Sequence, residues 1–418
     1  MRITEKTGRQ LIYTQLIYLL FINIGISMIH LPAASLYLTD AITLLLFICS
    51  LKYIGATIKG IYLNIIYLPL GFLSILLIST TLYNGLSIPL FLWAIRNTYR
   101  FFMFFFICII VLIPEDIDRI FMLMCKIQII NVLLSLYQYF FMGIKQDFLG
   151  GIFGVNSGCN AWSNIYFCII TTFVICKYIN NKISKYWLIF IVSTTLLLGA
   201  LAELKIFFIE FVLILIGSIL WNKPSKKMVQ ILIFSLLMGA VGIVCFANVF
   251  PDAYATLIDY QTAFQYASSS SWGYGISRLG ALSDINRIFF HNNLFYILFG
   301  MGFGNCESSN FSLCKSVFSD KYEIYGYRWF SHQMWYLEGG VMGFLLFISF
   351  FVVLFFYVRR VGYYLSKYSE YISFTKIFIM ILVINLWYNQ GIRIEVAYFS
   401  FFALAVVPVL VKHSGQCT

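Results

Sequence analysis

The sequence predicts an all-α integral membrane protein, because of its composition and its long apolar runs. The chain has 418 residues, of which 61% are hydrophobic and only 11% are charged, and its mean hydropathy is +0.88. Apolar residues make up about half of an ordinary soluble domain, so this composition excludes one. Runs long enough to cross about 30 Å of hydrocarbon recur from end to end. We therefore expect one polytopic membrane domain over residues 1–418.

About twelve transmembrane helices are expected from these runs, each bounded by charged or turn-forming residues. The first run is long and lacks a small-residue cleavage site, so it is predicted to be a span rather than a signal peptide. The expected spans cover residues 11–29, 33–50, 61–80, 90–112, 119–140, 161–177, 187–202, 206–221, 228–249, 333–357, 373–389 and 395–411.

The distribution of cations predicts the orientation of these spans. When the chain is threaded through twelve spans, the Lys and Arg residues of the loops gather on one side, together with both termini. Cytoplasmic loops of membrane proteins collect Lys and Arg, so this side is predicted to be cytoplasmic, and the net charge of +11 is a topology signal. The residues on this side are Lys6, Arg9, Lys52, Lys59, Arg119, Lys177, Lys182, Lys185, Lys223, Lys226, Lys227, Arg359, Arg360, Lys367 and Lys412.

One large hydrophilic loop, residues 250–331, is expected on the opposite face, between the ninth and tenth spans. It contains FYILFGMGFG (295–304), an apolar piece that is too short to span and is predicted to be re-entrant or interfacial. Cys306 and Cys314 lie in this loop, and in an oxidising compartment they either form a disulfide or remain free, which spacing does not decide. Long loops are often functional, so we expect the protein to act on its substrate at this face.

The sequence contains no motif for metal binding, nucleotide hydrolysis or dinucleotide binding. The four histidines are scattered, no Cys/His cluster has zinc spacing, and there is no phosphate-binding P-loop or dinucleotide-binding glycine motif after a strand. We therefore expect no metal, no cofactor and no nucleic-acid partner.

Cations near the outer boundary are the first candidates for a site. Arg96 and Arg100 in FLWAIRNTYRFF (91–102) are four residues apart and share one helix face. Two guanidinium groups one turn apart suit a phosphate or diphosphate, although both side chains would also serve as boundary anchors. Asp40 lies inside the second span, where a helix–helix hydrogen bond is expected.

Two outer turns carry further charges. In GALAELKIFFIE (199–210), Lys205 is expected to pair with Glu203 or Glu210 and steady the hairpin, or else to contact substrate. Arg393 has Glu395 beside it in WYNQGIRIEV (387–396), and by itself it is typical of an anchoring residue.

The stretch RWFSHQMWYLEGG (328–340) combines a cation, an imidazole and a carboxylate. Ser331 is predicted to cap the tenth span, with His332 as its first helical residue. Imidazole suits proton transfer near neutral pH, and a helix start suits an anion. An interfacial histidine in an aromatic belt is the alternative. Glu338 is expected on a different face from His332, and Gly339 with Gly343 predicts close approach of a neighbouring helix.

These pieces resemble the O-antigen polymerase and O-antigen ligase superfamily. That family reads loosely as an Arg in a long external loop, an apolar glycine-rich segment ending in Asn, and then Ser-His-Asn followed by Glu-Gly. This chain has Arg278, LFGMGFGN (298–305) and SHQMWYLEGG (331–340), and GIFGVNSGCNAWSN (151–164) is similar to the segment before the family's sixth span. Two positions depart from the pattern: Lys205 stands where an Arg is common, and Gln333 stands where the family has Asn.

The resemblance implies a GT-C-type glycosyltransferase that works without a metal on the periplasmic face of the bacterial inner membrane, with both termini cytoplasmic. Its donors would be undecaprenyl-diphosphate-linked oligosaccharides, and its partners membrane lipids and a chain-length regulator protein. The resemblance assigns His332 and Arg278 to catalysis, with His332 as base or acceptor-positioning residue. Arg96, Arg100, Lys205 and Arg328 would bind the diphosphate.

Three functions remain open at this point. The first is polymerisation of lipid-linked repeat units, which the R-x10-G spacing from Arg328 to Gly339 favours slightly. The second is ligation of the glycan to lipid A-core, which uses the same motifs. The third is transport of a lipid-linked sugar, but transporters often have internal repeats and mid-membrane broken helices, and no repeat is visible here.

Overall fold

A computed structural model describes residues 5–85, 87–249, 251, 254–255, 259, 261, 275–309 and 311–414. Within these ranges the protein consists of α-helices and short 3-10 turns, with no strand. Nine helices of the described ranges are long and apolar enough to cross a membrane. The protein is therefore a multi-pass, all-α membrane protein, which confirms the predicted fold class at this level.

A helix lies over each of the twelve expected segments. Three of the twelve, α7, α8 and α17, have 17 residues each. The helices are α1 (Glu5–Met28), α2 (Leu38–Gly60), α3 (Tyr67–Asn84), α4 (Ile88–Val111), α5 (Pro114–Phe140), α6 (Cys159–Ile179), α7 (Lys185–Leu201), α8 (Lys205–Trp221), α9 (Lys226–Val249), α15 (Ser331–Val361), α16 (Ser369–Tyr388) and α17 (Ala397–His413).

The largest difference in helix bounds concerns α2, which was expected to end near residue 50 and runs on to Gly60. The first lysine of this segment, Lys52, lies just beyond the expected end. Lys52 and Lys59 are exposed on the surface of the helix, and a lysine can lay its apolar stem along a helix while its ammonium group reaches water. A lysine thus marks the boundary of the hydrocarbon and not the end of the helix.

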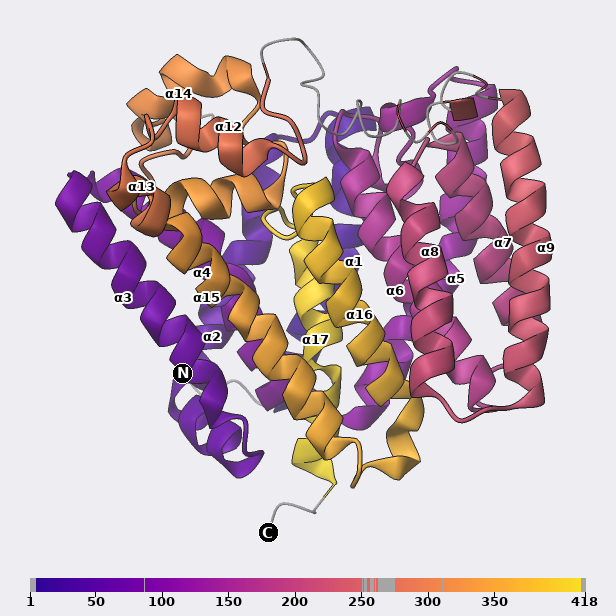
Figure 1. Ribbon diagram of the computed structural model, residues 1–418. Helices are drawn as coiled ribbons and strands as arrows, with labels where there is room; N and C mark the ends of the chain where they lie inside the picture. The colour runs from indigo at the N-terminus through magenta and orange to yellow at the C-terminus, as the bar shows by residue number, and fades with distance from the viewer. Residues whose placement is uncertain are drawn as a thin grey trace.

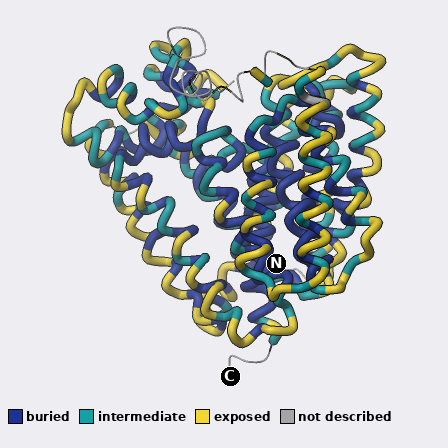
Figure 2. Tube along the Cα trace, turned by 45° about the vertical axis from the view of Figure 1, so that its right-hand side comes forward, coloured by how far each residue is buried: buried dark blue, intermediate teal, exposed yellow. Residues whose placement is uncertain are grey.

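The helices form a bundle with a clear centre and two flanks (Figure 1). α4, α6, α16 and α17 pack against one another in the middle; α2 and α3 flank one side, and α7, α8 and α9 flank the other. In the most apolar stretch of each helix, 94% of residues are buried in α6 but only 17% in α9. Figure 2 shows the same pattern, with exposed residues along the outer faces of the peripheral helices.

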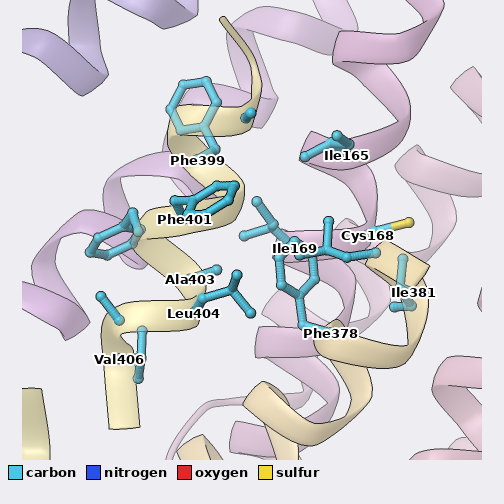
Figure 3. Close-up of a cluster of buried hydrophobic side chains, with 14 of the residues drawn as sticks. Ile165, Cys168, Ile169, Phe378, Ile381, Phe399, Phe401, Ala403, Leu404 and Val406 are labelled. Carbon is cyan, nitrogen blue, oxygen red and sulfur yellow. The ribbon is translucent and has the colours of Figure 1, made fainter. Parts of the chain in front are cut away.

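The centre of the bundle is a dry, aromatic-rich core. Ile169 of α6, Phe378 of α16 and Leu404 of α17 meet there (Figure 3). Inside a membrane the hydrophobic effect does not drive helices together, so close packing of this kind supplies the association. The core fixes α16 relative to α4 and α17, which carry most of the site described below.

The described part of the expected 250–331 loop has structure of its own. It contains α12 (Ala281–Ile288), α13 (Leu294–Phe299) and α14 (Val317–Tyr322), gathered at one end of the bundle, opposite the C-terminus (Figure 1). Phe289 and Tyr327 lie at the centre of a small separate core. Most of residues 250–274 lie outside the described residues. Cys306 and Cys314 are both free thiols, so of the two alternatives the disulfide is not formed.

The piece expected to be re-entrant or interfacial consists of α13 followed by a glycine turn that lies against the bundle. Gly300 and Gly340 both have positive φ, of 71° and 61°. A Cβ on Gly340 would lie 2.5 Å from the backbone of Leu298 and Phe299, so only glycine permits this approach. The conformation of Gly340 also interrupts α15. As expected, Gly339 and Gly343 let a neighbour approach, and that neighbour is α3.

Candidate functional site

Four arginines from three separate parts of the chain line one pocket of about 260 Å³ at the α12–α14 end of the bundle. Arg96 and Arg100 come from α4, Arg328 precedes α15, and Arg393 lies in the turn between α16 and α17. Glutamates and aromatic side chains complete the wall. We call this site the arginine pocket; its other lining residues include Tyr37, Trp93, Asn97, Glu307, Ser308, Met334, Gln390 and Glu395.

Arg96 and Arg100 share two carboxylates. Arg100 Nη1 lies 2.8 Å from Glu395 Oε1 and 3.2 Å from Asp40 Oδ1, and its Nη2 donates to the backbone carbonyl of Arg393 at 3.1 Å. Arg96 donates to Asp40 and lies 3.5 Å from Glu395. The four-residue spacing places both guanidinium groups on one face of α4, as predicted. Asp40, expected to make a helix–helix hydrogen bond, does so as an ion pair.

Arg96 is also held by two aromatic rings. Its guanidinium carbon lies 4.7 Å from the ring centres of both Tyr37 and Trp93. A cation over the face of an aromatic ring is attracted by the ring quadrupole. With the Asp40 pair, these contacts fix the side chain at the pocket wall, so the alternative of an outward-extended membrane anchor does not describe it.

Arg100 and Arg393 are the two most deeply placed of the four arginines, and Arg393 pairs with two acids that are distant from it in the chain. Its Nη2 lies 2.5 Å from Glu307 Oε1, and its Nη1 lies 3.5 Å from Glu338 Oε2. Both carboxylates are buried. The sequence placed Glu395 beside Arg393 and suggested a membrane anchor; instead, Glu395 pairs with Arg100. These charges are distant in the chain. The one feature of the sequence that could have indicated the site is Glu338, an acid inside an apolar helix.

Glu338 also pins the glycine turn. Its Oε1 accepts from the backbone N–H of Gly304 at 3.2 Å, and its backbone carbonyl accepts from Gly302 at 2.8 Å. Phe303 N–H donates to Thr81 Oγ1 of α3 at 2.6 Å. Glu338 is on a different face of α15 from His332, as expected, but it organises the arginine pocket by holding the turn that leads to Glu307.

His332 lies in an aromatic slot beside this pocket. Ser331 is the first residue of α15 and does not cap it, a correction to the prediction; its Oγ and N–H both donate to the Asn389 carbonyl, at 2.9 and 3.0 Å. The His332 ring stacks on Trp387 and Phe330, with ring centres 5.5 and 6.1 Å away. Because the ring is buried between these aromatic groups, His332 is not part of an exposed interfacial belt, which was the alternative interpretation of the sequence.

The hydrogen bond of His332 defines which ring nitrogen carries the proton. Nδ1 lies 3.0 Å from the carbonyl oxygen of Leu386, which only accepts, so Nδ1 carries hydrogen. Nε2 is buried and makes no hydrogen bond of ordinary geometry within the described residues. With hydrogen on Nδ1, a neutral imidazole carries its lone pair on Nε2, the atom that a general base uses, and here that atom is buried.

Arg278 lies beside His332 and is not among the residues that line the arginine pocket. Its guanidinium lies 5.1 Å from the ring centre of Phe330 and 5.0 Å from that of Tyr388, and its backbone lies beside the His332 ring. The predicted site residues therefore form two groups: three arginines in the pocket, and His332 with Arg278 in the slot. Lys205, the first residue of α8, is not among the residues that line the arginine pocket.

A buried amide network, which the sequence did not reveal, links α8 to both groups. Glu210 Oε1 accepts from Asn385 Nδ2 at 2.5 Å, and Asn389 Nδ2 donates to Asn385 Oδ1 at 2.8 Å. Asn389 Oδ1 then accepts from the Gly391 N–H at 2.7 Å, which shapes the turn carrying Arg393. Glu210 thus points into the bundle, where Cys168 also donates to it at 3.1 Å, and its expected hairpin role is replaced by this one.

The fold and the site together describe a multi-pass helical membrane protein with an arginine-lined pocket and a buried imidazole at one end of its bundle. Within the described ranges, no three His, Cys, Asp or Glu side chains gather in a way that could hold a metal ion. A scan against protein-family models found no match, and a search of curated proteins found none either.

Proposed function

We propose that this protein is a polysaccharide polymerase, a metal-independent glycosyltransferase that joins undecaprenyl-diphosphate-linked repeat units. The observation that supports the proposal most is the convergence of Arg96, Arg100, Arg328 and Arg393 on one pocket. Arginine offers a planar fork of donors that matches phosphate oxygens, and four such groups suit a diphosphate. A pocket of about 260 Å³ is below the usual range for a whole drug-sized ligand, so it fits the diphosphate while the glycan extends outside.

The proposed topology follows from the same assignment. About twelve spans in a GT-C-type bundle would place the arginine pocket and α12–α14 on the periplasmic side of the bacterial inner membrane, with both termini cytoplasmic. A lipid-linked substrate would then present its diphosphate at the boundary level, where the pocket lies. A chain-length regulator protein is the proposed protein partner.

The proposed reaction is a displacement at the anomeric carbon of the donor. The acceptor hydroxyl oxygen forms the new glycosidic bond as the bond from that carbon to the diphosphate breaks, and the bonding electron pair leaves with the diphosphate. The arginines stabilise this departing charge, which is electrostatic stabilisation of the transition state. The acceptor proton goes to a base, and we assign this role to Nε2 of His332.

In this scheme the arginine pocket and the His332 slot bind different substrates. The arginine pocket takes the donor diphosphate, and the slot that holds His332 and Arg278 takes the acceptor. Asp40, Glu395, Glu307 and Glu338 hold the arginines in place before substrate arrives, which preorganises the pocket. Arg328 is the most exposed of the four, with 37% of its side chain accessible, and is the one best able to adjust to the ligand.

Two other functions share part of this support. Ligation of a glycan to lipid A-core would use the same donor and the same pocket, and the Arg328–Gly339 spacing is the feature that favours polymerase. A lipid-linked oligosaccharide transporter or flippase is less well supported, because the arginine pocket lies at one end of the bundle and not at mid-depth, where transporters bind their cargo.

A reconstitution experiment tests the proposal. Purified protein in detergent is given lipid-linked repeat units, and products are resolved by length on a gel. A ladder that grows without nucleotide and without lipid A-core is expected for a polymerase. Arg100→Gln and His332→Gln should abolish the ladder, whereas Arg360→Gln, a matched charge loss at the far end of α15, should leave it unchanged. Ladder growth in both site variants would contradict the assignment.

A further inference from the structure

At the opposite end of α15, two cations share a pocket that contains no acid. Arg359 of α15 and Lys376 of α16 line a pocket of about 530 Å³, which Trp221 closes from the end of α8. None of its lining residues is an aspartate or glutamate. We call this site the Lys376 pocket. It lies at the end of the bundle that carries the C-terminus (Figure 1).

The two cations act on each other without a counter-ion. Arg359 and Lys376 line one pocket, so both positive charges lie beside the same cavity. Neither side chain makes an ion pair or a hydrogen bond in the described ranges. The nearest acid along α16, Glu370, is already paired with Lys182 at 2.7 Å and Lys177 at 3.6 Å. Like charges held together in this way destabilise the protein unless an anion joins them.

The depth of Lys376 makes the arrangement more costly. It is the eighth residue of α16, so it lies about 10 Å along the helix from Ser369. An ionisable side chain two turns inside a transmembrane helix is rare and marks a functional site by default. Its half-buried ammonium faces a pocket, and Ile372 and Phe355 line the same pocket with apolar surface.

We propose that the Lys376 pocket binds a phosphate group, supplied by the headgroup of an anionic phospholipid. Two cations can both donate to the oxygens of one phosphate group, and the apolar side chains beside them suit the start of an acyl chain. Trp221 and Tyr363 are of the residue types that gather at the headgroup level. Basic pockets between transmembrane helices on the cytoplasmic side bind anionic headgroups. This inference does not depend on the enzymatic activity proposed above.

A lipid titration monitored by native mass spectrometry tests the site. The full chain in neutral detergent is titrated with phosphatidylglycerol, and in parallel with phosphatidylcholine. Wild type is expected to bind one phosphatidylglycerol about thirtyfold more tightly than the Arg359→Gln/Lys376→Gln variant, since each of the two cations near the headgroup contributes about 1 kcal/mol. Arg360→Gln removes the same charge one residue away from the pocket and should bind like wild type. Equal binding by the double variant, or an equal loss in Arg360→Gln, would overturn the proposal.

Thermal unfolding separates binding from a structural role of the cations. Without lipid, Lys376→Gln should raise the Tm because it removes the repulsion. Phosphatidylglycerol should raise the Tm of wild type but not that of the variant, because a ligand stabilises only a protein that binds it. A lower lipid-free Tm together with an unchanged lipid shift would refute the site. Inorganic phosphate is the second arm: a full shift with phosphate alone assigns the pocket to free phosphate, and a shift with phosphatidylglycerol alone assigns it to the lipid headgroup.

Discussion

The cations at the two ends of α15 differ in whether acidic side chains neutralise them. In the arginine pocket every arginine has a carboxylate within 4 Å, and Arg96, Arg100 and Arg393 have two each. In the Lys376 pocket the two cations have none within the described ranges. The first site is held in shape by its own acids, so its geometry exists before any ligand binds. The second is completed only by an anion from outside.

The difference implies different costs for the same kind of mutation. Removing a paired, buried cation strands its carboxylates in a place where water cannot reach them, whereas removing an unpaired cation relieves repulsion. Loss of charge should therefore destabilise the first pocket and stabilise the second. The following predictions test this contrast, from the largest expected effect to the smallest.

Arg393→Ala is expected to have the largest effect. It leaves Glu307 and Glu338 buried without their cation, at a cost of about 3–5 kcal/mol, and it removes one of the four arginines proposed to bind the diphosphate. The Tm in detergent should fall steeply and polymer growth should cease. Arg393→Met combined with Glu307→Gln and Glu338→Gln should recover most of the Tm but no activity. If Arg393→Ala unfolds at the wild-type temperature, the pocket is not held together by its ion pairs.

Glu210 tests whether the amide network positions the turn. Glu210→Leu leaves Asn385 Nδ2 without its acceptor at a cost of about 1–3 kcal/mol, while Glu210→Gln keeps an acceptor oxygen in the same place. The Gln variant should retain the wild-type Tm and activity, and the Leu variant should lose both. The NMR signals of labelled His332 should show the Nδ1–H tautomer in wild type and in the Gln variant. Equal behaviour of the two variants would remove Glu210 from the network.

Arg328 separates stability from function at the arginine pocket. The one ion pair that Arg328 makes among the described residues, with Glu323 at 3.6 Å, is exposed, and such pairs contribute about 0–1 kcal/mol. Arg328→Gln should therefore leave the Tm within about a degree or two of wild type, while it raises the KM for the lipid-linked donor. Glu323→Gln removes the same pair without removing a pocket cation and should leave the KM unchanged. A matching rise in KM in Glu323→Gln would show that the pair, and not the arginine, matters.

The smallest effect concerns the packing of the segment that follows the glycine turn. Cys306 is fully buried, and burial raises the pKa of its thiol well above the usual value. Because the thiolate is the reactive form, a variant that retains only Cys306 should react slowly with maleimide at pH 8, with little gain up to pH 9. A variant that retains only Cys314, which is partly exposed, should react readily without reductant. Fast labelling of Cys306 would mean that this segment opens.

The sequence predicted the fold class and the places of the helices because those follow from local composition. Apolar runs long enough for a membrane mark each helix, and the helix spacing of Arg96 and Arg100 places them on one face. The glycines at 339 and 343 predicted the approach of a neighbour, which is α3. The ends of helices were less well predicted, as α2 shows, because a lysine that ends an apolar run does not end a helix.

The composition of the site was only partly predictable, since charge pairing is decided by long-range packing. Arg393 and Glu307 are 86 residues apart in the chain, and Arg100 and Glu395 are 295 apart. No local pattern relates such positions. The sequence placed Glu395 beside Arg393 and offered Glu210 as one of two partners for Lys205. In the structure Arg393 pairs with Glu307 and Glu338, and Glu210 accepts from Asn385 and Cys168.

The sequence by itself determined that this chain is a helical membrane protein with cations near the ends of its helices, because a span must be apolar and long enough to cross the hydrocarbon. Only the tertiary structure decided which cations are neutralised. A charge inside a bundle must be paired or must face a cavity, and the partner is whichever side chain the packing brings within reach. Packing therefore pairs the arginines at one end of α15 with carboxylates, whereas at the other end Arg359 and Lys376 line a pocket without an acid, which we propose binds an anion.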